Sequence, residues 1–281
     1  MASTFDRVRF GSRLTTRRLG RTLLARAQAG STNDEAWEAL ALNAPDGTVV
    51  VADAQTRGRG RDGRTWHTAP GRSLALSVLL HQGCDRPALG LLPLAAGLAV
   101  VQALETLGAA PALKWPNDVL LGGRKVAGVL CESRRVPVPA TAPPGRGVAP
   151  APARVAAVVG VGVNVSQATA DFPPEIAESA TSLALAGVAT DRESVAAAFL
   201  DAFEALWTRL QAGSGDAVLE AWTARAGFWG RPVVVRTPAG PVRGVARALA
   251  PDGALVLALE GGAETTVRAG DLELATGEAG A

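Results

Sequence analysis

The sequence predicts an α+β protein in which helices pack against a sheet and a small all-β module follows. Three observations favour this fold class. Apolar runs with the length of buried strands occur at residues 49–52, 73–80 and 155–165. Segments with helical apolar spacing lie between and after these runs. From Arg231 onwards the pattern changes to short strands separated by Pro/Gly turns, which is typical of an SH3-like barrel.

Length and composition are those of a globular protein with a large core. The chain has 281 residues, of which 48% are hydrophobic, so it is long enough to form more than one domain. We expect a large domain at residues 1–229 and a small β domain at residues 230–281. The 28 basic and 26 acidic residues leave a formal charge of only +2, which argues against a general nucleic-acid binder.

The sequence indicates a reducing, cytoplasmic location and no membrane span. Cys84 and Cys131 lie far apart and outside any metal-binding spacing, which argues against a disulfide framework and a zinc site. The N-terminus lacks the apolar run of a signal peptide. The apolar segment 89–107 is interrupted by Pro93 and Gly97, so we expect it to be a core helix.

A helix is expected at residues 31–42. It starts with the polar triplet Ser31, Thr32 and Asn33. Ser31 or Thr32 can cap the helix, and Thr32 and Glu35 have the spacing of a capping box. A helix start rich in hydroxyl and amide groups can also bind a polar ligand. These residues alone leave both interpretations open.

The most unusual segment is the basic loop at residues 55–66, which reads QTRGRGRDGRTW and contains four arginines and three glycines. The planar guanidinium of arginine can donate two parallel hydrogen bonds to carboxylate or phosphate oxygens, and glycines let backbone N–H groups approach an anion closely. The loop lacks the GK[ST] of a Walker A motif and the spacing of a Rossmann fingerprint. It also lacks aromatic residues among its arginines, so a small anionic ligand fits it better than a nucleic acid. A solvated, mobile basic loop is the alternative.

A second polar cluster follows a short strand at residues 111–115. The motif KWPNDV places Lys114, Asn117 and Asp118 around a Trp-Pro step that stiffens the backbone. A Gly-Gly turn then predicts a hairpin over residues 119–130.

The second strand of this hairpin carries two further candidate residues. Lys125 stands between apolar neighbours, where a lysine usually points to solvent. Gly128 lies in the middle of the strand, which indicates that another group approaches the backbone closely.

A proline- and alanine-rich stretch at residues 134–154 cannot pair as a strand and has little to bury, so we expect an exposed insertion. The run that follows, 155–165, is apolar throughout and is therefore expected at the centre of the sheet. Asn164 near its end must be hydrogen-bonded to backbone or to a ligand. Helices are expected at residues 191–212 and 216–225.

Five motifs in this order resemble those of one family. The segments STN, QTxGRGRxGRxW, KWPNDV, RKVAGVLxE and GVGVNV are similar to the motifs of biotin protein ligases, which adenylate biotin and attach it to a carrier lysine. The all-β tail resembles the C-terminal domain of that family. The resemblance implies a class II synthetase-like catalytic domain built on a mixed, mainly antiparallel sheet. It also implies that the protein uses biotin, ATP and Mg²⁺.

The chain departs from the family pattern at Asp62, where many members have a basic residue, and in the insertion at residues 134–154. About 25 residues precede the STN helix, too few for a winged helix-turn-helix domain. We therefore expect a monofunctional biotin–[acetyl-CoA-carboxylase] ligase without sequence-specific DNA binding. The expected partner is the biotin carboxyl carrier domain of a biotin-dependent carboxylase. No membrane partner is expected, and the enzyme would be a monomer or a homodimer.

The resemblance also implies roles for individual residues. The residues expected to bind biotin are Ser31, Thr32, Asn33, Gln55, Arg59, Gly60, Arg61, Lys125 and Gly128. The residues expected to bind ATP are Gly58, Arg61, Arg64, Trp66, Lys114, Asn117 and Asn164. The residues expected to act in catalysis are Arg59, Arg61, Lys125 and Asp118. No residue is expected to bind a metal directly, because Mg²⁺ would be held mainly through the phosphates.

The chemistry of these residue types agrees with such a reaction. A carboxylate is already an ionised nucleophile near neutral pH, so its adenylation needs cations rather than a general base. The acceptor lysine, in contrast, must lose a proton before it attacks. Asp118 is either that base or a residue that orients Lys114 or the backbone. A lipoate-type ligase or transferase of the same fold and a non-enzymatic biotin- or nucleotide-binding module are the alternative functions.

Overall fold

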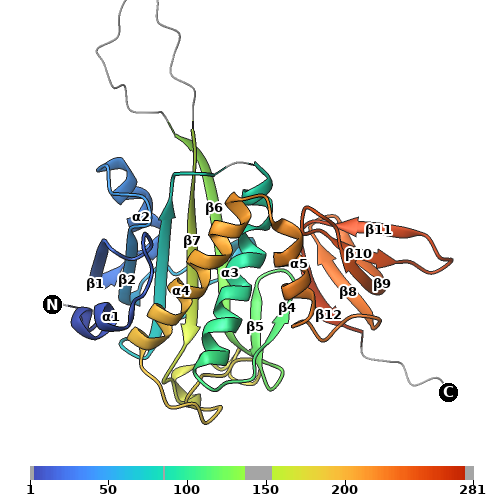
Figure 1. The fold of residues 1–281 in the computed structure, drawn as a ribbon. Coiled ribbons are helices and arrows are strands. Elements are labelled where there is room, and N and C mark those ends of the chain that lie inside the picture. The colour runs from blue at the N-terminus through green and yellow to red at the C-terminus, as the bar shows by residue number, and fades with distance from the viewer. Residues whose placement is uncertain (1–2, 85, 137–153, 276–281) are drawn as a thin grey trace, which may run out of the picture.

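The computed structural model describes residues 3–84, 86–136 and 154–275, which form two sheets and five α-helices (Figure 1). The α-helices are α1 (Arg7–Arg13), α2 (Thr32–Ala41), α3 (Arg86–Thr106), α4 (Arg192–Gln211) and α5 (Gly215–Thr223). The strands of the large sheet are β1 (Leu23–Ala29), β2 (Val49–Gln55), β3 (Ser73–Leu80), β4 (Ala112–Lys114), β5 (Asp118–Leu121), β6 (Arg124–Val136) and β7 (Arg154–Asn164). The strands of the small sheet are β8 (Pro232–Thr237), β9 (Gly240–Leu249), β10 (Leu255–Ala258), β11 (Glu264–Val267) and β12 (Asp271–Leu274).

The large sheet has the strand order β1-β2-β3-β7-β6-β5-β4. β1 and β2 pair in parallel, and all the other neighbouring strands of this sheet are antiparallel. The predicted mixed, mainly antiparallel sheet packed with helices is therefore confirmed. β7 lies at its centre, as its apolar sequence predicts, because a central strand is covered on both faces.

Side-chain alternation divides β7 between two environments. Every second residue from Ala157 to Val163 belongs to the core under α3 and α4, which lie on one face of the sheet (Figure 1). Ala156 and Val158 face the other side, where they pack with Trp37 of α2. Further along that side, the strand carries Gly160 beside the N-terminal end of α2, followed by Gly162 and Asn164. A cavity opens there.

α3 is the core helix that the sequence predicts. Its segment Ala88–Thr106 is nevertheless long and apolar enough to cross a membrane, contrary to our expectation for this chain. In the fold, 72% of its most apolar window is buried within the protein. The helix packs against the large sheet and against α4, which lies beside it on the same face.

The start of α2 is capped differently from the prediction. Ser31 is the N-cap residue, but its side chain makes no capping hydrogen bond, and Thr32 is already helical, so the predicted capping box is wrong. The N–H of Thr32 instead donates to Oε1 of Gln55 at 2.8 Å. Because an amide from β2 supplies the cap, the Ser31 hydroxyl is not used in capping the helix.

α1 and β1 are not predicted from the sequence. A buried ion pair holds the segment before α1 against the rest of the fold. Asp53 of β2 and Arg192 of α4 lie 2.8 Å apart, and both side chains are 8% exposed. Asp53 also accepts the N–H of Thr4 at 2.6 Å. One carboxylate thus joins three segments that are far apart in the sequence.

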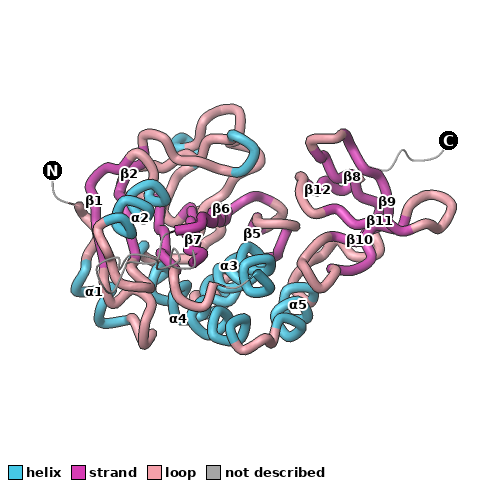
Figure 2. The backbone as a smooth tube through the Cα atoms, turned by 90° about the horizontal axis from the view of Figure 1, so that it is seen from above, coloured by secondary structure: helices cyan, strands magenta, loops and turns pink. Residues whose placement is uncertain are grey.

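The small sheet is antiparallel with the order β11-β10-β9-β8-β12, and it follows α5 at the end of the molecule opposite the N-terminus (Figure 2). Its inner face buries Val233, Val235, Leu255 and Leu257. The predicted SH3-like all-β module is therefore confirmed as a fold class. The indole N–H of Trp115 donates to the carbonyl oxygen of Gly253 at 3.2 Å and so connects this sheet to the large one.

The ends of the predicted insertion are paired, which corrects the prediction of an unpaired stretch from 134 to 154. Arg134 pairs with Ala156, and Val136 pairs with Arg154. The ladder extends into this polar sequence because backbone hydrogen bonds do not depend on apolar side chains. The rest of the predicted insertion, 137–153, lies outside the described residues.

Candidate active site

A cavity of about 400 Å³ lies beside the glycine-bearing side of β7, and this volume is typical of small-molecule sites. Its wall comes from the start of α2, the basic loop, β5, β6, β7 and the segment that follows β7. The fold brings nearly all the predicted site residues to this wall. They are Ser31, Thr32, Asn33, Gln55, Arg59, Gly60, Arg61, Arg64, Trp66, Lys114, Asn117, Asp118, Lys125, Gly128 and Asn164.

Gly58 is the predicted site residue that does not line the cavity. A Cβ at this position would lie 2.4 Å from the carbonyl oxygen of Trp66. The N–H of Trp66 donates to the carbonyl oxygen of Gly58 at 2.9 Å. Glycine is required here because the two ends of the basic loop meet at this point.

One end of the cavity is formed by uncharged polar groups. Ser31, Thr32 and Asn33 are 4%, 4% and 3% exposed, and Gln55 reaches them from β2. The hydroxyl of Thr32 lies 3.2 Å from Oε1 of Gln55. This end of the cavity suits a neutral ligand group that both donates and accepts hydrogen bonds.

Glycines of β6 and β7 form the floor of the cavity. A Cβ on Gly162 would lie 2.2 Å from Cε2 of the Trp66 indole, and a Cβ on Gly160 would lie 2.3 Å from Oδ1 of Asn33. These two glycines therefore let an indole and an amide lie directly on the sheet. Lys125 accounts for the expected close approach at Gly128, where a Cβ would lie 3.1 Å from its Cε and 3.2 Å from its Nζ, with the Trp66 indole at 3.4 Å.

The Trp66 side chain stands between the floor and the cations of the cavity. The ammonium of Lys125 is 5.7 Å from the centre of the indole ring, which is within range of a cation–π contact. The indole N–H is buried and has no hydrogen-bond partner among the described residues. A buried donor without a partner is rare, so a ligand acceptor at this position would satisfy it.

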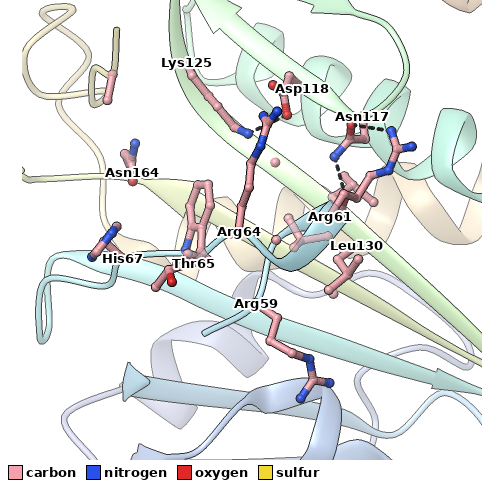
Figure 3. Close-up of a pocket in the computed structure, with 18 of the residues that line it drawn as sticks. Arg59, Arg61, Arg64, Thr65, His67, Asn117, Asp118, Lys125, Leu130 and Asn164 are labelled. Atoms are coloured by element: carbon pink, nitrogen blue, oxygen red, sulfur yellow. Dashed lines mark hydrogen bonds and ion pairs between the residues drawn. The ribbon is translucent and has the colours of Figure 1, made fainter. Parts of the chain in front are cut away.

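Arg59 points away from the other cations of the site (Figure 3). Its guanidinium donates to both carboxylate oxygens of Asp34, at 2.7 and 2.8 Å, and to Glu132 at 2.9 Å. The indole N–H of Trp37 donates to the other oxygen of Glu132 at 2.7 Å. Arg59 therefore ties the basic loop to α2 and β6, and carboxylates of the protein compensate its charge.

These contacts keep the Arg59 guanidinium and the Glu132 carboxylate ionised. The hydrogen bond to Asp34 raises the pKa of Arg59 above its usual value. Burial alone would raise the pKa of Glu132, but hydrogen bonds from Trp37 and Arg59 outweigh that effect and lower it. Both groups remain charged across the physiological pH range, so the attachment of the loop does not depend on pH there.

Arg61 and Arg64 have different partners. Arg61 donates to the amide oxygen of Asn117 at 3.2 Å, and Asn117 in turn donates to the carbonyl oxygen of Val129 at 2.9 Å (Figure 3). Arg64 pairs with Asp271 of β12, and this contact raises the pKa of Arg64. Among the described residues no carboxylate lies within ion-pair distance of Arg61, so its charge is available to an anionic ligand.

Lys125 faces the cavity rather than solvent, which corrects the usual expectation for a lysine on a strand. Its Nζ lies 2.6 Å from Oδ1 of Asp118, and the two side chains are 35% and 11% exposed. The contact arises because β5 and β6 are neighbours in the sheet. The carboxylate of Asp118 is thus paired with Lys125 and not with Lys114, the lysine partner considered from the sequence.

Asn164 is 4% exposed, and the prediction that it is hydrogen-bonded is confirmed. Its amide N–H donates to the carbonyl oxygen of Thr181 at 2.9 Å, and Gln167 donates to its Oδ1 at 2.8 Å. Both ends of the side chain are therefore held by the protein.

Two parts of the cavity wall were not predicted from the sequence. The first is an apolar wall made by Phe172, Ile176 and Ala180 in the segment after β7. This segment has neither helical nor strand periodicity, so its apolar residues give no pattern. The second is Asp271, which lies 207 residues from its partner Arg64. No local motif could connect them.

The cavity fits a metal ion only together with a ligand. The described residues contain no group of three or more His, Cys, Asp or Glu side chains that could hold a metal. Asp118 and Asp271, two carboxylates of the wall, are each paired with a cation of the protein. Most ligands of a Mg²⁺ ion would therefore come from a bound nucleotide.

Comparison with known proteins agrees with this geometry. Residues 24–142 match the Biotin/lipoate A/B protein ligase family, and residues 228–274 match the Biotin protein ligase C terminal domain. The Biotin--[acetyl-CoA-carboxylase] ligase of Mycobacterium tuberculosis is 38% identical over 255 residues, covering 88% of this chain and 86% of that protein. The Bifunctional ligase/repressor BirA of Bacillus subtilis is 33% identical over 269 residues, covering 95% and 78%.

Solved structures give the same result. The biotin protein ligase from Aquifex aeolicus in complex with biotin and ATP superposes with a TM-score of 0.72 at 28% identity. The match covers 90% of this chain and 98% of that one.

Proposed function

This chain belongs to the biotin protein ligase family, and we infer that it activates biotin with ATP to biotinyl-5′-AMP and transfers the biotin to a carrier lysine. One observation supports this function above all others. A single cavity has a neutral hydrogen-bonding end at Ser31, Thr32 and Asn33, and a cationic end at Arg61 and Lys125. Biotin has the same polarity, with a neutral ureido ring at one end and a carboxylate at the other.

In the adenylation step, we propose that the chain's own cations bring two anions together. Arg61 has no carboxylate partner among the described residues and would bind the phosphates or the carboxylate of biotin. Lys125 would bind the reacting carboxylate or the α-phosphate. Such preorganised cations stabilise the charge that develops at the α-phosphorus. Trp66 lies against the glycines of the cavity floor and would form part of the wall of the nucleotide pocket.

Arg59 has a different proposed role from the biotin contact expected for it. Since its guanidinium is bound by Asp34 and Glu132, it would position the basic loop rather than contact the substrate. Ordering a loop in advance reduces the conformational entropy that a ligand must overcome on binding.

For the transfer step, Asp118 remains the proposed base. Its carboxylate lies in the cavity wall and contacts Lys125 at 2.6 Å. The acceptor amine of the carrier would therefore reach Asp118 only after Lys125 moves to the bound carboxylate or phosphate. In this scheme one lysine movement links the end of adenylation to the start of transfer.

Mg²⁺ is the proposed metal, and when bound it would neutralise charge on the phosphates. The described residues offer no three-ligand cluster, so the ion would be held mainly through ATP. We also propose a biotin carboxyl carrier domain as the protein substrate and the cytoplasm as the location, with the enzyme acting as a monomer or a homodimer. The comparisons do not favour a lipoate-type ligase or a binding module.

The test is release of pyrophosphate from ATP by the purified protein. We expect release that requires biotin and Mg²⁺, together with labelling of a biotin carboxyl carrier domain by radioactive biotin. Lipoate in place of biotin is the control, and it should give neither signal. Biotin-independent turnover, or equal turnover with lipoate, would contradict the assignment.

A further inference from the structure

We propose that Ser77, a buried residue of β3 outside the cavity wall, is a positioning residue that sets the hydrogen-bonding polarity of the biotin site. Through Thr32 and Asn33 it would determine which groups of the cavity donate and which accept. This inference rests on the proposed function and goes beyond it, because Ser77 belongs to none of the motifs and does not itself reach the ligand.

Ser77 lies directly behind the polar end of the cavity. It is 0% exposed, and its Oγ lies 2.7 Å from Oδ1 of Asn33 and 2.8 Å from Oγ1 of Thr32. Its register partner on β7 is Gly160, where a Cβ would lie 2.3 Å from the same Asn33 oxygen. Ser77 and Gly160 therefore hold the Asn33 side chain together: the glycine leaves space for it, and the serine makes a hydrogen bond with it.

The orientation of the Asn33 amide follows from its surroundings. Its Nδ2 lies 3.4 Å from the carbonyl oxygen of Leu130, and the Glu132 carboxylate lies near the same amide. Both neighbours are acceptors, so this side of the amide must be the NH₂ group. The side that faces Ser77 is therefore the oxygen, which only accepts.

The direction of the remaining hydrogen bonds is then fixed. Ser77 has one hydroxyl proton, and the buried Oδ1 of Asn33 needs it. Since that proton is used, Ser77 can only accept from Thr32. The Thr32 hydroxyl thus donates to Ser77 at 2.8 Å, a shorter contact than its 3.2 Å distance to Gln55.

The consequence is that Thr32 offers lone pairs, and no proton, to the cavity. Oε1 of Gln55 accepts the N–H of Thr32 at 2.8 Å, and its second lone pair is the other acceptor near the Thr32 hydroxyl, at the longer distance of 3.2 Å. An acceptor at Thr32 matches an N–H of the ureido ring of biotin. Without Ser77, the Thr32 proton keeps only the longer contact to Gln55 at 3.2 Å, so it can also turn towards the cavity, where it would oppose the ureido N–H.

A double-mutant cycle tests this relay, by which we mean the hydrogen bonds that connect Asn33 through Ser77 to Thr32. Ser77→Ala should weaken biotin binding about tenfold, the effect of one lost hydrogen bond, in isothermal titration and in the KM for biotin. The KM for ATP should change by less than about twofold, because the relay does not reach the nucleotide end. In a Thr32→Val background, where the relay is already broken, Ser77→Ala should cost less than about threefold. Equal losses in both backgrounds would overturn the proposal.

The matched control is Thr48→Ala. Thr48 is also 0% exposed and loses one buried hydrogen bond, to the carbonyl oxygen of Pro45 at 2.7 Å, but it lies outside the cavity wall. It should lower the melting temperature as Ser77→Ala does and leave the KM for biotin unchanged. Biotin-dependent pyrophosphate release by the wild type separates the two hypotheses. Its absence contradicts the proposed function, whereas its presence with an unaffected Ser77→Ala variant contradicts only the relay.

Discussion

At the scale of single residues, the cations of the cavity differ in how far the protein itself compensates their charge. Arg59 and Arg64 are paired with carboxylates from α2, β6 and β12, whereas Arg61 has no carboxylate partner in the described part of the chain and donates to the neutral amide of Asn117. Lys125 has one carboxylate partner, Asp118, which also lines the cavity. A guanidinium that already has two carboxylate partners gains less from a phosphate than one that has none.

This difference predicts different effects for two substitutions. Lys125→Ala should slow formation of biotinyl-AMP, since Lys125 stands on a rigid strand beside the reacting groups. Arg61→Gly should instead release the intermediate faster, because Arg61 belongs to the loop that covers it. Each lost charge-assisted contact should cost about 1.5–3 kcal/mol. Single-turnover adenylation and the half-life of bound biotinyl-AMP measure the two effects, and Lys125→Arg serves as the charge-retaining control. Wild-type adenylation by Lys125→Ala would show that its assigned role is wrong.

At the scale of elements, β7 shows how one strand serves both core and site. One face is a continuous row of alanine and valine under α3, and the other changes from Ala156 and Val158 to Gly160 and Gly162 where the cavity begins. The alternation of a strand makes this possible without any break in the core.

Gly162→Ala tests the role of this floor. The new methyl group would lie 2.2 Å from Cε2 of the Trp66 indole, so the ring must leave its place. We expect a shift in tryptophan fluorescence and a loss of ATP affinity, with folding retained. Gly227→Ala is the control, since a Cβ there meets no atom within 4 Å. Unchanged ATP affinity in Gly162→Ala would show that the indole position does not matter for nucleotide binding.

The basic loop is a second element whose behaviour can be measured. Charge density and glycine content predict that residues 58–64 are mobile without ligand and become ordered with biotinyl-AMP. The Arg59 contacts to Asp34 and Glu132 anchor one point of this loop, so residues after Arg59 should show the larger gain in protection. Hydrogen exchange with and without ligand measures this gain. Equal protection of the segment in both states would contradict the prediction.

At the scale of the whole molecule, the Asp53–Arg192 pair connects the N-terminal segment, the sheet and α4. Burial alone would raise the pKa of Asp53, but hydrogen bonds from Thr4 and Arg192 outweigh it and lower the pKa below its usual value. A lowered folded-state pKa means that this stabilisation is present above the unfolded-state pKa of about 3.9. It is lost as the pH falls through the folded-state value.

Asp53→Asn should therefore destabilise the protein by about 3 kcal/mol near neutral pH, because Arg192 stays buried without its partner. The difference from wild type should shrink below pH about 3.9, as the wild-type carboxylate also becomes protonated. Urea unfolding at a series of pH values measures both effects. Asp252→Asn, which breaks an ion pair between side chains that are 73% and 49% exposed, is the control and should cost less than about 1 kcal/mol. A pH-independent difference would contradict the prediction.

The fold class, the family and most of the polar residues of the cavity wall could be predicted from the sequence alone, whereas the apolar wall and Asp271 could not. Buried strands such as β3 and β7 have a local signal in their apolar runs, and the motifs are short enough to be recognised without distant contacts. The contacts that these residues make with one another follow only from the tertiary structure. Asp118 contacts Lys125 rather than Lys114, Arg59 contacts Asp34 and Glu132, and Gln55 caps α2. A partner depends on which strands become neighbours and on how their side chains alternate, and no local pattern along the chain contains that information.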